Sequence, residues 1–286
     1  MFKPILHLIG SQLEAAVDPE IKKRLKQLPN NLNEFNYDAW GFYPDVAQYG
    51  LTLMTWLYKY YYRTEVYDID RVPQGRVLLI ANHSGQLPMD GVMIAISMLL
   101  EADPPRLVRA MVERWFGSFP LVGTFVARHG SILGDPKNCI SLLENNECVL
   151  VFPEGVKGSG KVWRDRYQLM DFGLGFMRLA LKTKTPIVPV SVIGGEEQAP
   201  ALYNAKSIAK LLGLPYFPIT PTFPWLGLLG TIPYPTKYKI YFGDPLYFQG
   251  DPNDTDEEIQ KKVDIVKSKI YKNIRYGLAQ RENIFW

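Results

Sequence analysis

The chain contains 286 residues, of which 47% are hydrophobic and 21% are charged. This balance is that of an ordinary globular protein and excludes a disordered chain, and the length fits one large α/β domain or two small ones. The net charge of +3 at pH 7 is too small to predict nucleic-acid binding, although it is compatible with an anionic membrane surface or an acidic carrier protein. The two cysteines, Cys139 and Cys148, lie beside apolar residues, which favours buried, reduced thiols in a cytosolic protein.

Residues 1–64 are predicted to form an N-terminal helical region. Pro4 interrupts the first apolar residues too early for a secretory signal peptide, so we expect a cytoplasmic protein. Residues 21–28 show a basic amphipathic pattern, and residues 46–62 a helix rich in Trp and Tyr that is too short to cross a bilayer. Both segments are compatible with docking on a membrane surface and, equally, with packing on the body of the protein.

A short apolar run over residues 77–81 predicts a buried strand that is followed closely by His83. Pro88 suits the first position of a helix, and Asp90 then lies in the first turn of that helix. Open α/β folds place their chemistry where strand ends face helix starts. A carboxylate bonded to one imidazole nitrogen makes the other nitrogen a better proton acceptor. This pair therefore predicts a general base that acts on a hydroxyl group of the substrate.

A second apolar run over residues 149–152 breaks into a Pro-Glu-Gly turn. Several basic side chains follow within a short window, and cations beside backbone amides can cradle a phosphate. We predict that this turn and its cations hold the polar head of the substrate. The residues predicted to bind substrate are Glu154, Gly155, Lys157, Lys161 and Arg166.

Residues 172–182 predict a crossover helix and residues 186–192 another buried strand. The alternation of strands and helices predicts an α/β fold with a mixed, mainly parallel sheet flanked by helices. Residues 211–236 carry no charge, but six prolines exclude a membrane-spanning helix, so we expect an irregular apolar lobe that covers a channel or contacts a membrane. The α/β domain is predicted over residues 65–250, and a C-terminal helix packed on it over residues 251–286.

The order of these blocks resembles the glycerophospholipid acyltransferase family, which includes the lysophosphatidate and glycerol-phosphate acyltransferases. That family carries N-H-x-x-x-x-D, then G-x-I-x-x-x-R, then F-P-E-G-T-R-S, and then an apolar V-P-V block. The matching blocks of this chain begin at Asn82, Gly130, Phe152 and Val188, and together they span roughly residues 75–195.

The chain also departs from the family pattern. Six residues rather than four separate His83 from Asp90, so Asp90 reaches the position of the family's aspartate by a different path. No arginine stands in register after Gly130, and Thr-Arg-Ser is replaced by Val-Lys-Gly, in which Lys157 lacks the bidentate fork of arginine. We therefore expect the catalytic pair to be kept and the recognition of the acceptor to be altered.

The resemblance implies an O-acyltransferase of phospholipid or other lipid metabolism. It would move a fatty acyl group from acyl-CoA or acyl carrier protein to a hydroxyl of a glycerolipid or lysophospholipid-type acceptor. His83 would remove the proton from that hydroxyl and Asp90 would orient His83, with no metal ion and no bound cofactor. Because the acceptor is a lipid, the membrane surface is an expected partner, and we expect a cytoplasmic protein that is peripheral on the membrane.

Two other classes of function compete with this interpretation. A non-catalytic lipid-binding protein of the same fold is compatible with the altered blocks. Nucleotide binding is suggested by the match of residues 155–161 to G-x-x-x-x-G-K, but Val162 stands where a P-loop needs Ser or Thr.

Overall fold

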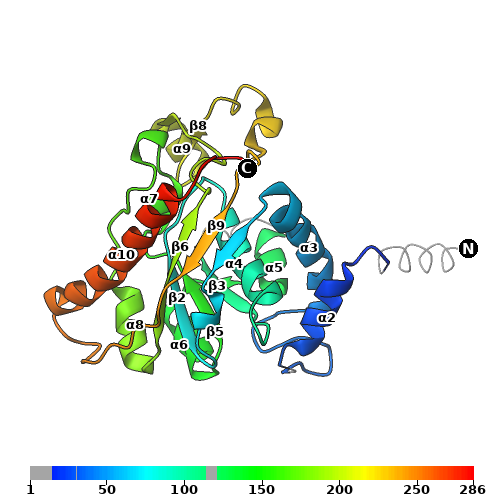
Figure 1. Cartoon of the computed structure of the whole chain (residues 1–286), viewed down its shortest axis with the longest axis vertical. Helices are drawn as coiled ribbons and strands as arrows, with labels where there is room; N and C mark the ends of the chain where they lie inside the picture. The colour runs from blue at the N-terminus through cyan, green and yellow to red at the C-terminus, as the bar shows by residue number, and fades with distance from the viewer. Residues whose placement is uncertain (1–14, 30, 114–120) are drawn as a thin grey trace, which may run out of the picture.

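The computed structural model describes residues 15–29, 31–113 and 121–286, so the first fourteen residues of the predicted N-terminal region lie outside it. In this part of the chain a sheet of seven strands forms the centre of the molecule (Figure 1), in the order β1-β9-β6-β2-β5-β3-β4. The strands of this sheet are β1 Glu65–Tyr67, β2 Val77–Ala81, β3 Val108–Val112, β4 Ile132–Leu133, β5 Cys148–Val151, β6 Ile187–Ile193 and β9 Lys239–Phe242. A separate antiparallel pair joins β7 Tyr203–Asn204 to β8 Pro218–Ile219.

The sheet is mainly parallel. β2 pairs in parallel with β5 and with β6, and β3 pairs in parallel with β5 and β4. β9 runs antiparallel to β6, and β1 is parallel to β9, so these two strands reverse the direction at one edge. The predicted mixed, mainly parallel sheet is thereby confirmed.

Helices cover both faces of the sheet, as Figure 1 shows, with α8 and α10 on one side and α2 and α3 on the other. The helices of the described chain are α2 Pro19–Gln27, α3 Pro44–Trp56, α4 Met89–Leu100, α5 Val122–Arg128, α6 Pro136–Glu144, α7 Val156–Ser159, α8 Gly175–Thr183, α9 Lys206–Leu212 and α10 Asp256–Ala279. A π-helical turn, Leu57–Tyr61, continues α3, and 3₁₀ turns cover Ile69–Arg71, Trp163–Asp165 and Gly227–Thr231. No helix within these described ranges has the length and apolar character needed to cross a membrane.

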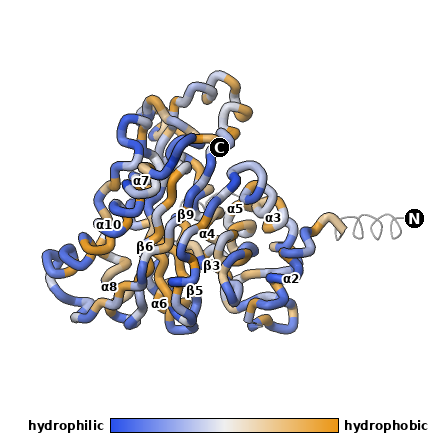
Figure 2. Tube along the Cα trace, viewed as in Figure 1, coloured by the Kyte–Doolittle hydropathy of each residue, from blue (hydrophilic) through white to orange (hydrophobic). Residues whose placement is uncertain are grey.

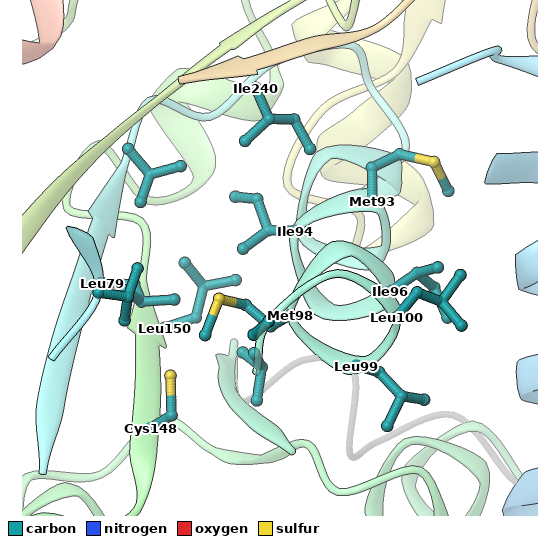
Figure 3. Close-up of a cluster of buried hydrophobic side chains, with 14 of the residues drawn as sticks. Leu79, Met93, Ile94, Ile96, Met98, Leu99, Leu100, Cys148, Leu150 and Ile240 are labelled. Carbon is teal, nitrogen blue, oxygen red and sulfur yellow. The ribbon is translucent and has the colours of Figure 1, made fainter. Parts of the chain in front are cut away.

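The central strand β2 supplies two separate cores, because successive side chains of a strand point to opposite faces. Val77, Leu79 and Ala81 belong to the core beneath α4, whereas Leu78 and Ile80 belong to the core beneath α6, α8 and α10. All five residues are buried, which is why this segment reads as a continuous apolar run rather than an alternating one. Figure 2 shows this concentration of hydrophobic residues along the central strands, and Figure 3 the packing of α4 on β2 and β5.

The C-terminal helix α10 packs on β6 and closes the second core. Its N-cap is Thr255, whose hydroxyl accepts a hydrogen bond from the backbone N–H of Glu258 at 3.4 Å, as the capping pattern predicts. Its buried stripe consists of Ile259, Val263, Val266, Ile270 and Ile274. Residues 211–236, by contrast, form an irregular lobe of short segments with several exposed apolar side chains, as expected.

The N-terminal segment is joined to the sheet by a buried ion-pair cluster. Arg109 of β3 is 3% exposed and donates hydrogen bonds to Asp38 and to Glu147, the latter at 3.1 Å. The guanidinium also lies over the ring of Trp40, 5.2 Å from its centroid. The two carboxylates and the aromatic ring compensate in part for the hydration that the guanidinium loses on burial.

We predict that Arg109→Met lowers the free energy of unfolding by ~3–5 kcal/mol, because it leaves Asp38 and Glu147 without their cation. Urea unfolding of the full chain measures this change. The matched control is Arg164→Met, because the Arg164 side chain is 85% exposed and forms a long ion pair of 3.6 Å with its neighbour Asp165. The control should change the free energy of unfolding by less than ~0.5 kcal/mol, and equal urea midpoints for the two variants would contradict the prediction.

Candidate active site

The candidate site lies at the carboxyl ends of three adjacent strands. His83 follows β2, the Pro-Glu-Gly turn at Glu154 follows β5, and the polar segment 194–198 follows β6. Because β2 pairs in parallel with both β5 and β6, these three ends meet at one edge of the sheet. The crevice outside the carboxyl ends of the strands is the usual ligand site of open α/β sheets.

His83 and Asp90 form the hydrogen-bonded pair that the sequence predicts. Nδ1 of His83 lies 2.7 Å from Oδ2 of Asp90, whose side chain is fully buried. Oδ2 also accepts a hydrogen bond from the backbone N–H of Ser84 at 2.9 Å, and Oδ1 one from Gly91 at 2.8 Å. Asp90 stands in the first turn of α4, where the helix dipole favours a negative charge. An ionised Asp90 can only accept, so Nδ1 of His83 carries the proton and Nε2 is left as the proton acceptor.

The two additional residues between His83 and Asp90 are accommodated by a tight loop. Gly85 and Gln86 both adopt positive φ, at +81° and +62°. A Cβ atom on Gly85 would lie 2.1 Å from the carbonyl oxygen of Gly195, so only glycine fits there. The loop therefore returns the chain to α4 with Asp90 against the imidazole, despite the longer spacing.

The ring of His83 is held between the carboxylate and an aromatic face. Phe152 stacks on it with ring centroids 4.2 Å apart and planes inclined by 25°. Burial is the largest influence on the imidazole and lowers its pKa. The charge and hydrogen bond of Asp90, with the more distant charge of Glu154, outweigh it, so the pKa of His83 is raised above its ordinary 6.5.

A pocket of about 200 Å³, here called the His83 pocket, opens beside this ring. It runs between α4, β3 and α5, and its walls are mostly aliphatic and aromatic. Representative wall residues are Val92, Ala95, Val108, Met111, Phe125 and Val126. Gly155 also lines this pocket, so the structure brings one residue of the predicted substrate-binding turn beside His83.

Glu154 and Lys161 lie inside the protein rather than in the pocket. Glu154 accepts hydrogen bonds from the backbone N–H of His83 at 2.9 Å and of Met170 at 2.7 Å. The ammonium of Lys161 lies 3.4 Å from Glu154 and 2.9 Å from Glu196, and its side chain is 1% exposed. Burial opposes the charge of Lys161, but the two carboxylates outweigh burial and raise its pKa above 10.5. These two side chains therefore brace the loops, and neither one faces a ligand in the His83 pocket.

The remaining predicted cations do not form a cradle around His83. Lys157 is exposed on α7, and Arg166 is exposed with its guanidinium over the ring of Trp163. Neither side chain lines the His83 pocket. The P-loop alternative fails for a different reason. Its lysine, Lys161, is bound to two carboxylates and cannot contact a nucleotide phosphate.

Two supporting residues escaped the sequence analysis. Asn82 donates to the carbonyl of Val192 at 3.0 Å and accepts from its N–H at 2.8 Å, which joins β2 to β6 just before His83. Gln198 donates to the carbonyls of Gly85 and Leu87, both at 3.0 Å, which fixes the loop after His83. The sequence signal for Gln198 is the polar run Glu-Glu-Gln that follows a buried strand, the same signal that pointed to His83.

Within residues 15–29, 31–113 and 121–286, no group of three or more His, Cys, Asp or Glu side chains is arranged to hold a metal ion. A hydrogen-bonded imidazole–carboxylate pair at the mouth of an apolar pocket is an arrangement that can transfer a proton.

The chain is similar to several known proteins. Residues 63–193 match the family model described as Acyltransferase. An uncharacterized protein from Mycobacterium tuberculosis is 37% identical over 283 residues, covering 96% of this chain and 77% of that protein. The "DGAT1/2-independent enzyme synthesizing storage lipids" of Gallus gallus is 24% identical over 201 residues, which is 70% of this chain and 56% of that enzyme.

Among solved structures, the chain shares its fold with the 1-acyl-sn-glycerophosphate (LPA) acyltransferase PlsC from Thermotoga maritima. The TM-score is 0.51 at 18% sequence identity, and the match covers 84% of this chain and 83% of that one. The family match extends from β1 to the end of β6 and thus includes His83, Asp90 and the Glu154 turn. The chain therefore belongs to the acyltransferase family and is an O-acyltransferase.

Proposed function

We propose that this acyltransferase moves a fatty acyl group from a thioester donor, acyl-CoA or acyl carrier protein, to a hydroxyl of a glycerolipid or lysophospholipid-type acceptor. The observation that carries the proposal is the 2.7 Å contact between His83 and the buried Asp90 beside an apolar pocket. A thioester donor suits the site because its hydrocarbon chain can occupy the His83 pocket, whose walls are apolar. The similarity to an enzyme that synthesizes storage lipids supports a lipid acceptor.

In the proposed reaction, Nε2 of His83 removes the proton from the acceptor hydroxyl as its oxygen attacks the thioester carbonyl carbon. Asp90 keeps the ring oriented and stabilises the imidazolium that forms. When the tetrahedral intermediate collapses, the carbon–sulfur bond breaks and the imidazolium returns its proton to the leaving thiolate. The products are the ester and the free thiol of the carrier, so His83 is regenerated within each turnover.

We propose that the enzyme acts as a cytoplasmic protein on a membrane surface, and that the N-terminal region up to residue 64 takes part in docking. This docking proposal is supported by an apolar stripe along the outer face of α3 and the following turn. Val46, Tyr49, Leu53, Trp56 and Tyr60 recur there at helical spacing and are all exposed. Exposed Trp and Tyr side chains suit the boundary between lipid headgroups and hydrocarbon.

Replacing His83 by Ala should lower kcat by ~10²–10⁴-fold, because the variant lacks the proposed acceptor of the hydroxyl proton. Steady-state transfer of labelled acyl groups measures the change, with circular dichroism as the check that the variant is folded. Near-normal turnover by a folded His83→Ala variant would contradict the role of His83 as the base.

The pH dependence of kcat/KM should have an acidic limb above pH 6.5. Only the neutral imidazole accepts a proton, and the pKa of His83 is raised, so activity is lost as the pH falls through this raised value. In Asp90→Asn the carboxylate that raises the pKa is gone, so the limb should move to lower pH while kcat falls. An acidic limb at the same pH in both proteins would contradict the assignment of Asp90.

Lys161→Met should lower the free energy of unfolding by ~3–5 kcal/mol, because Glu154 and Glu196 lose their shared cation. Urea unfolding measures the change, and Lys157→Met at the exposed neighbouring lysine is the matched control, with an expected change below ~0.5 kcal/mol. An increase in the acceptor KM with unchanged stability would instead show that Lys161 binds the acceptor.

A further inference from the structure

A second pocket, of about 230 Å³, lies in the irregular lobe on the far side of Tyr216 from the His83 pocket. Its walls come from residues 86–87, 198–200, 214–223 and 230–234, and none of the lining side chains is charged. We call it the lobe pocket. The reaction proposed above places the donor chain in the His83 pocket and assigns no ligand to the lobe pocket.

The two pockets meet at the loop that follows His83. Tyr216 lines both, and its hydroxyl donates a hydrogen bond to the carbonyl of Gln86 at 2.6 Å. The backbone N–H of Gln86 in turn donates to the carbonyl of Ser159, a residue of the His83 pocket, at 3.1 Å. A molecule seated in the lobe pocket therefore lies next to the loop that carries the proposed base.

The charge distribution argues against a phosphorylated head group at this junction. Apart from the imidazoles of His83 and His129, the charged side chain among the described residues that line the two pockets is Glu113, which is acidic. His129, also in the His83 pocket, favours its neutral form because burial lowers its pKa. Lys161 is already neutralised by its two carboxylates. A phosphate placed here would be desolvated beside an acid, and the lining residues that the structure describes include no Lys or Arg to pair with it.

Gln86 offers a polar contact for an uncharged group instead. Its side chain is 7% exposed and lines the lobe pocket. The amide nitrogen donates to the carbonyl of Lys161 at 2.7 Å, which identifies Oε1 as an acceptor. In the described part of the chain this oxygen is buried without a hydrogen-bond partner, so a ligand hydroxyl that reached it would satisfy it.

The outer rim of the lobe is apolar. Trp225 is 71% exposed, and Leu226, Leu228 and Leu229 beside it are also exposed. Exposed apolar clusters of this kind mark contacts with lipid or with other apolar partners. A substrate that is dissolved in the hydrocarbon of a membrane would meet this rim before it reaches the pocket.

We propose that the lobe pocket binds the hydrocarbon part of the acceptor, and that the acceptor is an uncharged lipid alcohol such as a monoacylglycerol. This inference rests on the proposed acyl transfer and narrows its acceptor. The donor chain occupies the His83 pocket, the acceptor chain occupies the lobe pocket, and the acceptor hydroxyl reaches His83 past Tyr216.

The test uses the full chain with palmitoyl-CoA or palmitoyl acyl carrier protein as donor. Monooleoylglycerol is compared with oleoyl lysophosphatidate, which adds only the phosphate, and with glycerol, which lacks the chain. We expect kcat/KM for monooleoylglycerol to exceed that for the lysophosphatidate by ~10-fold or more, and no product from glycerol. A preference for the lysophosphatidate, or for glycerol, overturns the inference but leaves acyl transfer standing. Absence of transfer from either donor to any acceptor overturns the proposed function itself.

A matched pair of variants tests which pocket holds which chain. Ala199→Phe fills the lobe pocket and should raise the KM for monooleoylglycerol by ~10-fold while the donor KM changes by less than ~2-fold. Ala95→Phe fills the His83 pocket and should instead raise the KM of the palmitoyl donor. An effect of Ala199→Phe on the donor alone overturns the assignment. If either variant fails to fold in thermal unfolding, the acceptor comparison with the unaltered chain still decides between a charged and an uncharged acceptor.

Discussion

The carboxylate of Glu154 joins the loops on which the active site is built. One oxygen holds the backbone of His83 after β2, and the other holds Met170 and faces the ammonium of Lys161. A buried carboxylate requires such partners, and its partners here come from three separate stretches of the chain. The backbone at His83 is therefore fixed by Glu154, while its ring is fixed by Asp90 and Phe152. The position of the proton acceptor follows from both sets of contacts.

Polar groups beneath the site extend this bracing toward β6. Burial raises the pKa of Glu196 to about 7, although Lys161 acts in the opposite direction. Next to it, Glu197 accepts hydrogen bonds from Tyr167 and from Arg281 at the end of α10. Replacing a buried ion pair by apolar residues is often neutral or stabilising, so these charges are poorly explained by stability alone. These charged groups surround the loops that hold His83, and we infer that their role is to fix the positions of those loops.

Much of the fold and the central pair could be predicted from the sequence, because both leave local signals. An uninterrupted apolar run predicts β2. His83 follows at the end of this strand, and Asp90 lies at the start of the next helix. The burial of Lys161 and its pairing with Glu196 could not be predicted in this way. In the sequence it belongs to the cluster of cations predicted to hold the polar head of the substrate, and only the fold shows that Lys161, which follows α7, points inward to Glu196. The partner, Glu196, lies 35 positions later in the chain, so no local pattern links the two.

The contacts that hold the imidazole and those that line the pockets are of different kinds. Backbone amides, buried carboxylates and the close approach of Gly85 to Gly195 hold the imidazole, and a change in any of these would move it. The walls of the lobe consist of side chains on irregular segments, for which one apolar residue can substitute for another. Substrate range can consequently diverge between relatives through the lobe while the reaction itself is inherited unchanged. Sequence variation that concentrates in residues 214–234, on a constant background at the strand ends, would be the evolutionary record of such divergence.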